Sequence, residues 1–254
     1  MKKQVCQREE LYKYANELLQ VDSYKDYCPN GLQVQGKSDI KLIVSGVTAS
    51  QALIEAAIKI KADAILVHHG WFWRSDESPI VGQLHRRLKL LMDHDINLIA
   101  YHLPLDGHLT LGNNAQLGKQ MGWKTTGQSQ ANRLVWYGKP NSGQGTLGKL
   151  SKDIEQKLSR KPLLIGNPAK KITKIAWCTG AAQGYLEEAI ALGVDVFISG
   201  EVSEPTFHLA QESGVAYIAA GHHATERYGV QALGNALAKK FGIRHQFIDI
   251  PNPV

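Results

Sequence analysis

The sequence has few cysteines and lacks any long apolar run. Its 254 residues include three cysteines, Cys6, Cys28 and Cys178, which stand far apart. An odd number of widely spaced cysteines does not fit a disulfide framework or a cluster of thiolate metal ligands. The first residues have no apolar core of the kind that a signal peptide needs, and no run is long enough to span a bilayer. We therefore expect reduced thiols in a cytoplasmic protein that inserts into no membrane.

Charge of one sign is concentrated only in two short patches, near Lys170-Lys171 and Lys239-Lys240. The formal net charge is +6, but the lysines and arginines are scattered. This excess favours anionic partners, yet it forms no basic stripe with interleaved aromatic residues, so direct nucleic-acid binding is an alternative with only weak support. No Gly-x-Ser-x-Gly elbow is present, which removes support for serine-hydrolase chemistry. With 43% hydrophobic residues, the chain can form one large or two small globular domains.

The chain contains an internal repeat. Residues 41–70, "KLIVSGVTASQALIEAAIKIKADAILVHHG", match residues 174–201, "KIAWCTGAAQGYLEEAIALGVDVFISGE". Each stretch has an apolar run, a small-residue turn, a helix-like segment and a second apolar run, which together predict a β-α-β unit. Residues 88–106 and 207–226 also match, each as a helix, a turn and a buried strand.

The repeat predicts an α/β fold of duplicated β-α-β modules that form two similar interlinked domains. We place the first module in residues 1–126 and the second in residues 127–254. The C-terminal part of the second module can also pack with the first module, around a site that binds metal ions. The connector, residues 125–145, is rich in Gly, Ser, Gln and Asn, as a boundary loop or a hairpin should be. Residues 8–19 predict an amphipathic helix, and residues 26–36 a turn followed by a short extended piece.

Histidines and carboxylates gather at the predicted strand ends. The carboxyl ends of parallel strands share one sheet edge, where ligands usually bind. The polar residues that the repeat places at such ends are His68, His69, His102, Asp106, Glu201, His222, His223 and Glu226.

Imidazole nitrogen and carboxylate oxygen are the ligands that Zn, Fe, Mn or Ni prefer at a hydrolytic site, so this set predicts metal binding. Adjacent strand residues diverge, so His68 and His69 favour two ions over one. His222 and Glu226 share one helix face at their spacing, whereas His223 points elsewhere. His222 is therefore the better candidate ligand of the second histidine pair.

Other residues near these motifs have plainer interpretations. Trp71, Phe72 and Trp73 follow the first histidine pair and predict a packed lip or an interface, although such a lip could also stack on a ring-shaped substrate. Cys178 ends a predicted strand and is expected to be a buried, inert thiol. His108 lies near Asp106 and could support the ligands. The histidines expected at the surface are His85, His94, His208 and His245.

The motifs "PNGLQVQG", "GVTAS", "VHHG", "HLPLD", "LGNNAQL", "FISGEVSE" and "AAGHHATE" together closely resemble the NIF3-like family, whose bacterial members are often named GTP cyclohydrolase 1 type 2 homologues. The resemblance runs from about Asp26 to the C-terminal "FIDIPNP", and the chain is similar to the short type without an inserted domain. It implies a duplicated α/β fold, a di-metal centre between the modules and a toroidal homohexamer. The metal ligands that it implies are His68, His69, Asp106, His222 and a bridging Glu226.

Several functions fit these features. The first is a hydrolase with two divalent metal ions per chain, which acts on a nucleotide or a related heterocycle, including a damaged one. A metal-activated water would add to C8 of a purine ring, with ring opening and loss of formate, while His102 or Glu201 relays protons or supports the ligands. The alternatives are a metal-dependent phosphoesterase and a non-catalytic ring that serves as a metal-binding regulator or scaffold. The expected partners are further copies of the chain and a small nucleotide-like molecule.

Overall fold

The computed structural model describes residues 5–76, 79–131 and 133–254, and the chain divides into two compact units. Unit 1 comprises Met1–Gly112 with Gly229–Pro251, and unit 2 comprises Asn113–Tyr228 with Asn252–Val254. The predicted boundary between residues 126 and 127 differs from this division. Residues 113–126 group with unit 2 because a helix there packs Leu117 and Met121 into the core of that unit.

Unit 1 is built on a five-stranded sheet with the order β13-β4-β5-β6-β2. Strands β13, β4, β5 and β6 run parallel, and β2 pairs antiparallel with β6. A short antiparallel pair, β1 with β3, lies outside this sheet. The elements of unit 1 are β1 (Cys6–Gln7), α1 (Arg8–Leu19), the 3-10 helix η1 (Val21–Ser23), β2 (Gly31–Val34), β3 (Asp39–Ile40), β4 (Leu42–Thr48), α2 (Gln51–Lys59), β5 (Ala64–His69), α3 (Gly82–Asp93), β6 (Asn97–Ala100), α4 (Leu103–Gly107) and β13 (Arg244–Phe247).

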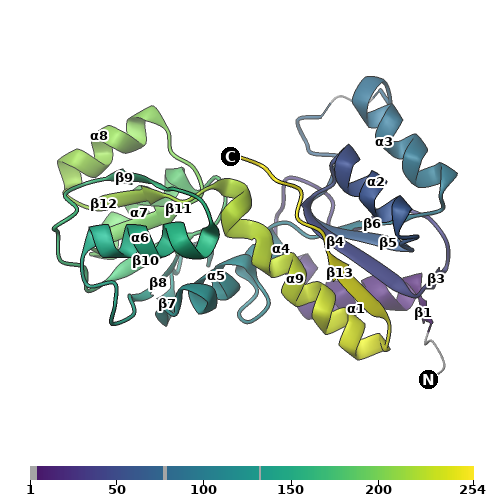
Figure 1. Ribbon diagram of the computed structural model, residues 1–254, viewed down its shortest axis with the longest axis horizontal. Helices are drawn as coiled ribbons and strands as arrows, with labels where there is room; N and C mark the ends of the chain where they lie inside the picture. The colour runs from purple at the N-terminus through teal and green to yellow at the C-terminus, as the bar shows by residue number, and fades with distance from the viewer. Residues whose placement is uncertain (1–4, 77–78, 132) are drawn as a thin grey trace. The chain divides into compact units, whose positions relative to one another are not determined.

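Helices cover both faces of this sheet because its central strands are apolar on both sides. Successive residues of β4 face different clusters, so Val44 packs with α2 and α3, whereas Ile43 packs with α1 and with the helix before β13. In Figure 1, α2 and α3 lie on one face of the sheet, and α1 and α9 lie on the other. The predicted helix of residues 8–19 is confirmed as α1, and the extended piece that follows it as β2.

Unit 2 is built on a six-stranded sheet with the order β7-β8-β10-β11-β12-β9. Strands β10, β11 and β12 are parallel, and the other pairs are antiparallel. The elements of unit 2 are α5 (Asn113–Met121), β7 (Lys124–Gln128), β8 (Trp136–Lys139), α6 (Leu147–Leu158), β9 (Leu163–Ile165), β10 (Ile175–Cys178), the 3-10 helix η2 (Gln183–Tyr185), α7 (Leu186–Ala191), β11 (Val196–Ser199), α8 (Glu204–Ser213) and β12 (Ala216–Ala219).

The duplicated β-α-β pattern is confirmed, since β4-β5-β6 and β10-β11-β12 are each three parallel strands. The connector that was expected to be a boundary loop or a hairpin contains the antiparallel strands β7 and β8. Helix α9 (His222–Phe241) begins in unit 2 and ends in unit 1, so the C-terminal part of the chain packs with the first module's core through Val230, Leu233 and Leu237.

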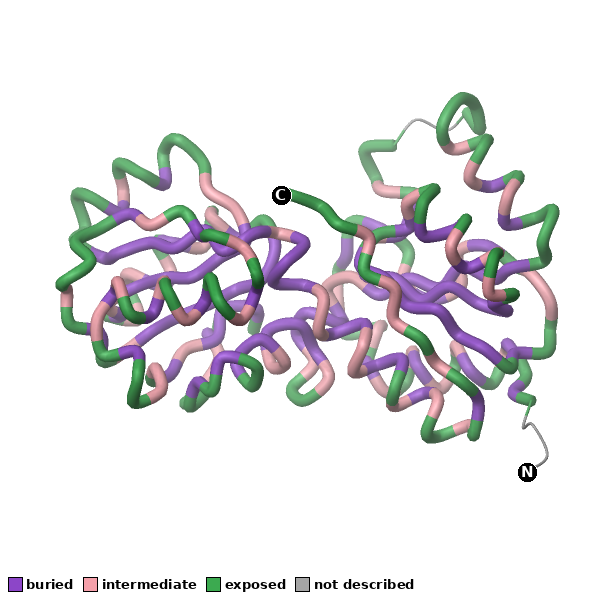
Figure 2. Tube along the Cα trace, in the orientation of Figure 1, coloured by how far each residue is buried: buried purple, intermediate pink, exposed green. Residues whose placement is uncertain are grey.

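Burial follows the sheets in both units, as the purple strands of Figure 2 show. Cys6, Cys28 and Cys178 are all buried free thiols, which agrees with the expectation of reduced cysteines. Over the residues that the structure describes, no helix combines the length and the apolar character needed to cross a membrane.

Candidate metal centre

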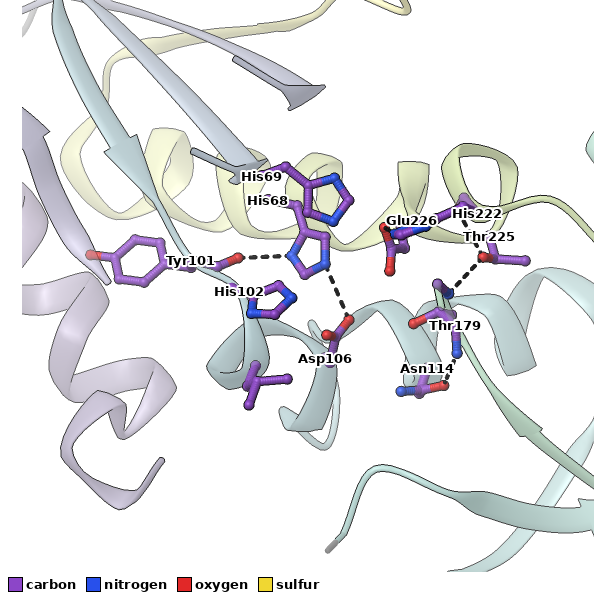
Figure 3. A network of polar contacts seen from close by, with 12 residues as sticks. His68, His69, Tyr101, His102, Asp106, Asn114, Thr179, His222, Thr225 and Glu226 are labelled. Carbon is purple, nitrogen blue, oxygen red and sulfur yellow. Dashed lines mark hydrogen bonds and ion pairs between the residues drawn. The ribbon is translucent and has the colours of Figure 1, made fainter. Parts of the chain in front are cut away.

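In unit 1, three histidines lie at the carboxyl ends of two adjacent parallel strands, where the sequence predicts them. His68 and His69 are the last residues of β5, and His102 follows β6 and caps α4, which carries Asp106 (Figure 3). One nitrogen of each of the three imidazole rings lies within 4.8 Å of a nitrogen of the other two. The fold of unit 1 therefore brings three nitrogen donors to one place.

The hydrogen bond of His68 defines which of its nitrogens can bind a metal. Its Nδ1 lies 2.9 Å from the backbone oxygen of Tyr101, and because a carbonyl oxygen only accepts, Nδ1 carries the proton. The Nε2 atom of neutral His68 then has a lone pair, and it lies 3.5 Å from Asp106 Oδ1. Both side chains are buried, so two electron-pair donors face each other in the interior of the unit.

The rings of His68 and His69 lie close together, although the side chains of adjacent strand residues normally point to opposite faces of the sheet. Their centroids lie 4.5 Å apart with an angle of 44° between the planes. His69 ends the strand and is only half-buried, and its Nδ1 lies 3.3 Å from Thr48 Oγ1. Both rings are near enough to reach a single ion together with His102, so the divergence argument for two ions does not hold at this position.

His102 is held by the segment before β2, for which the sequence predicts only a turn. Its Nδ1 donates to Asp26 Oδ1 at 2.7 Å, and its backbone N–H donates to Asn30 Oδ1 at 2.8 Å. Burial acts to raise the pKa of Asp26, but the hydrogen bonds from His102 and Asn30 and the electrostatic interaction with His102 outweigh burial and lower this pKa to about 2. Asp26 is therefore a carboxylate at neutral pH.

In unit 2, His222 lies between two carboxylates. Its Nδ1 is 2.7 Å from Glu201 Oε1, and its Nε2 is 3.0 Å from Glu226 Oε2, one helical turn further along α9. The prediction that His222 and Glu226 share one helix face is confirmed. Glu201, which follows β11, is an immediate neighbour of the ring. The backbone N–H of His223 donates to the backbone oxygen of Val254, so the next residue has a different environment.

The two carboxylates change the proton affinity of His222. Burial lowers the pKa of this imidazole, but the hydrogen bonds and negative charges of Glu226 and Glu201 outweigh burial and raise it to about 9. A side chain that is buried beside two anions favours a cation at that position, whether a proton or a metal ion. Glu226 is almost completely buried, which strengthens this preference.

A glycine makes room for the Glu226 carboxylate. Gly180 follows β10 with a φ of +70°, and a Cβ atom there would lie 2.1 Å from Glu226 Oε1. Its backbone N–H donates to Thr225 Oγ1 at 3.1 Å, and Asn114 Oδ1 accepts from the N–H of Thr179 at 3.0 Å (Figure 3). The Gly180 loop is thereby tied to α9 and α5 within unit 2.

The donor chemistry in each unit fits a divalent metal ion. Unit 1 offers imidazole nitrogens beside Asp106, and unit 2 offers His222 beside Glu226. In both places a carboxylate oxygen faces an imidazole Nε2, while a carbonyl or a carboxylate accepts from the opposite ring nitrogen. This second hydrogen bond is typical of metal-binding histidines, because it fixes the tautomer and the ring orientation.

The three aromatic residues after His69 have different environments: Trp71 lies in the core, Trp73 lies beside His102, and Phe72 is exposed. Trp71 is buried in the core of unit 1, and its Nε1 donates to the backbone oxygen of Ala49 at 3.0 Å. The expectation that it lies in a lip or an interface is therefore wrong. Trp73 is half-buried, and its ring contacts His102 edge-on with centroids 4.9 Å apart. Phe72 is 37% exposed and has a φ of +65°.

The remaining histidines contribute little to these clusters. His85, His94 and His208 are exposed, as expected. His245 is half-buried rather than exposed, and its Nε2 lies 2.7 Å from Ser45 Oγ while its Nδ1 lies 2.8 Å from Asn235 Oδ1. His108 accepts backbone hydrogen bonds from Thr110 and Leu111 at the end of α4, and burial lowers its pKa.

The loop before α6 has the spacing Gly-x-Gly-x-x-Gly at residues 143–148, which also occurs in dinucleotide-binding loops. Its local contacts differ from those of a phosphate cradle. The backbone N–H groups of Leu147 and Gly148 donate to the carbonyl oxygens of Lys170 and Pro168. Since these N–H groups already have protein acceptors, the glycine spacing does not indicate a nucleotide site.

The chain is similar to known proteins over nearly its whole length. The family described as Duf34/NIF3 (NGG1p interacting factor 3) matches residues 6–253. A Pseudomonas aeruginosa protein named GTP cyclohydrolase 1 type 2 homolog is 50% identical over 251 residues, which cover 96% of this chain and 97% of that protein.

Two solved structures share the fold at substantial sequence identity. The structure described as protein ybgI, unknown function, has a TM-score of 0.93 and 46% identity, and the match covers 98% of this chain and 100% of that one. The structure of TTHA1606 from Thermus thermophilus has a TM-score of 0.86 and 31% identity, with coverage of 98% and 100%. The chain therefore belongs to the Duf34/NIF3 family and has its duplicated α/β fold.

Proposed function

We propose that this protein is a metal-dependent hydrolase of nucleotides or related heterocycles. Its proposed ligands for two divalent ions are His68, His69, Asp106, His222 and Glu226. One observation carries the proposal: in each unit a carboxylate oxygen faces an imidazole Nε2 whose partner nitrogen is already hydrogen-bonded. An imidazole that is oriented in this way presents its remaining nitrogen to a metal ion.

When bound, a pair of divalent ions lowers the pKa of water toward neutrality and polarises the bond that is attacked. The protein's own residues supply orientation. Glu201 accepts from His222 Nδ1, so a supporting role fits Glu201 better than direct proton transfer. Glu226, with its buried carboxylate, is the proposed bridging ligand. The mixed nitrogen and oxygen donors suit Zn, Fe, Mn or Ni.

A planar heterocyclic substrate is supported by the aromatic residues of unit 1. The rings of Tyr27 and Trp73 both approach His102, with centroid distances of 6.4 and 4.9 Å. Tyr27 is largely exposed, so its face is open to a flat ligand. The names of the similar proteins, which refer to GTP cyclohydrolase, agree with a nucleotide as the substrate class.

The test is a substrate screen with the metal-reconstituted protein and detection by mass spectrometry. Nucleotides, modified nucleosides and phosphoesters are incubated with the full chain, and a Glu226→Gln variant serves as the control for metal-dependent turnover. Ring opening with release of formate supports the proposal. Phosphate release without ring opening would replace it by a phosphoesterase function. Metal binding without turnover of any compound would replace it by a regulatory or scaffold function.

A further inference from the structure

The segment from Asp26 to Asn30 holds His102 from two sides, although it carries none of the ligands proposed above. Asp26 Oδ1 accepts from His102 Nδ1 at 2.7 Å and from the backbone N–H of Tyr27 at 2.6 Å. Asp26 Oδ2 accepts from Asn30 Nδ2 at 2.8 Å and from the backbone N–H of Leu103 at 2.9 Å. A carboxylate offers about four lone-pair positions, so the acceptor capacity of Asp26 is fully used.

This saturation separates the roles of Asp26 and His102. Asp26 has no lone pair left for a metal ion, even though it lies close to other potential ligands. His102 uses Nδ1 for Asp26, which leaves Nε2 as its electron-pair donor. The ring centroid of His102 lies 5.1 Å from that of His68 and 5.9 Å from that of His69. The imidazole is thus oriented as a ligand, and the carboxylate is placed behind it.

We propose that Asp26 is a positioning residue that presents His102 Nε2 as a third nitrogen ligand beside His68 and His69. The inference rests on the proposed metal-binding function and adds a ligand to it. The pair has the carboxylate–histidine arrangement that orients metal-binding imidazoles and raises their basicity. The Trp73 ring also packs against this imidazole, with centroids 4.9 Å apart and an angle of 85° between the planes.

The test measures Co²⁺ binding to the full chain by calorimetry and by visible absorption, because the absorption bands of Co²⁺ report on its ligands. His102→Ala is expected to weaken binding and to shift these bands, and added imidazole is expected to restore them. Asp26→Asn is expected to lower the affinity by about 10- to 100-fold, as loss of a carboxylate behind a metal-binding histidine does. The matched controls are Asp22→Asn and His94→Ala, at exposed positions.

Circular dichroism shows whether each variant keeps its fold, and the imidazole rescue of His102→Ala separates a ligand from a purely structural residue. If His102→Ala and Asp26→Asn keep the affinity and the spectrum of the parent protein, the inference is overturned while the proposed function stands. If the parent protein itself binds no Co²⁺, both are overturned. If the variants lose affinity but imidazole restores nothing, His102 is structural and the inference fails.

Discussion

His222 Nε2 and Glu226 Oε2 face each other 3.0 Å apart across one turn of α9. The pair depends on neighbours that are distant in sequence, since Glu201 accepts from the other nitrogen of His222 and Gly180 lies against the Glu226 carboxylate. Within unit 2, the helix supplies the spacing of the two proposed ligands, and the ends of β10 and β11 determine their surroundings.

We expect the metal-reconstituted chain to contain close to two divalent ions. The expectation follows from the five proposed ligands, because a catalytic ion that keeps a position for water takes about three protein ligands, so five donors are more than one ion would use. Elemental analysis of the reconstituted protein measures the ratio. A ratio that stays near zero under excess metal would refute the metal centre as a whole.

Glu226→Gln is expected to release at least one ion, with affinity reduced by about 100-fold or more. The amide keeps the size of the side chain but removes the negative charge that offsets bound cations. Calorimetry and elemental analysis measure the loss, and circular dichroism monitors the fold. The control is Glu212→Gln, at an exposed position of α8, which should bind metal normally. Unchanged metal content in Glu226→Gln would show that Glu226 is not a bridging ligand.

Gly180→Ala is expected to destabilise the protein by about 1–3 kcal/mol and to weaken metal binding. Its φ of +70° is unfavourable for alanine, and the new Cβ would displace the Glu226 carboxylate. Thermal unfolding and metal titration measure the two effects. Gly184→Ala is the matched control, because no atom lies within 4 Å of a Cβ at that position. Equal behaviour of the two variants would contradict the role assigned to Gly180.

His245 is expected to make unit 1 sensitive to acid. Burial lowers the pKa of this histidine in the folded state below its ordinary value of 6.5, so the unfolded chain binds the proton more readily. Its contribution to stability is therefore present above pH 6.5 and is lost as the pH falls through the lower folded-state value. Thermal unfolding of the parent protein and of His245→Gln should converge on acidification. A His94→Gln control, at an exposed position, should follow the parent protein at every pH.

We expect the chain to assemble into a ring of six copies, as the family resemblance implies. Phe72 is an exposed aromatic residue three positions after His69, and a second copy would remove its side chain from water. Phe72→Asn should weaken assembly without backbone strain, because asparagine tolerates the positive φ of 65°. Light scattering coupled to size exclusion measures the mass. A parent protein with the mass of one 28.0 kDa chain at micromolar concentration would contradict this expectation.

The order of the amino acids was sufficient to predict the duplicated fold and to select the main candidate ligands. Periodic apolar residues reveal β-α-β units, because buried parallel strands and amphipathic helices impose local spacings that repeat along the chain. The same spacings place His68 and His69 at the end of β5 and put His222 and Glu226 on one face of α9. These features depend on residues that are near neighbours in sequence.

Other features needed the folded chain, because they arise from contacts between distant residues. Asp26 reaches His102 across 76 positions, and no local pattern distinguishes it from an ordinary turn residue. Gly180 matters because the Glu226 carboxylate occupies the space of its missing side chain. Trp71 has the sequence context of a surface aromatic residue, but its indole lies in the core of unit 1. Packing and hydrogen-bond geometry determine these three features. Both arise only when the complete chain is folded, so local sequence patterns do not reveal them.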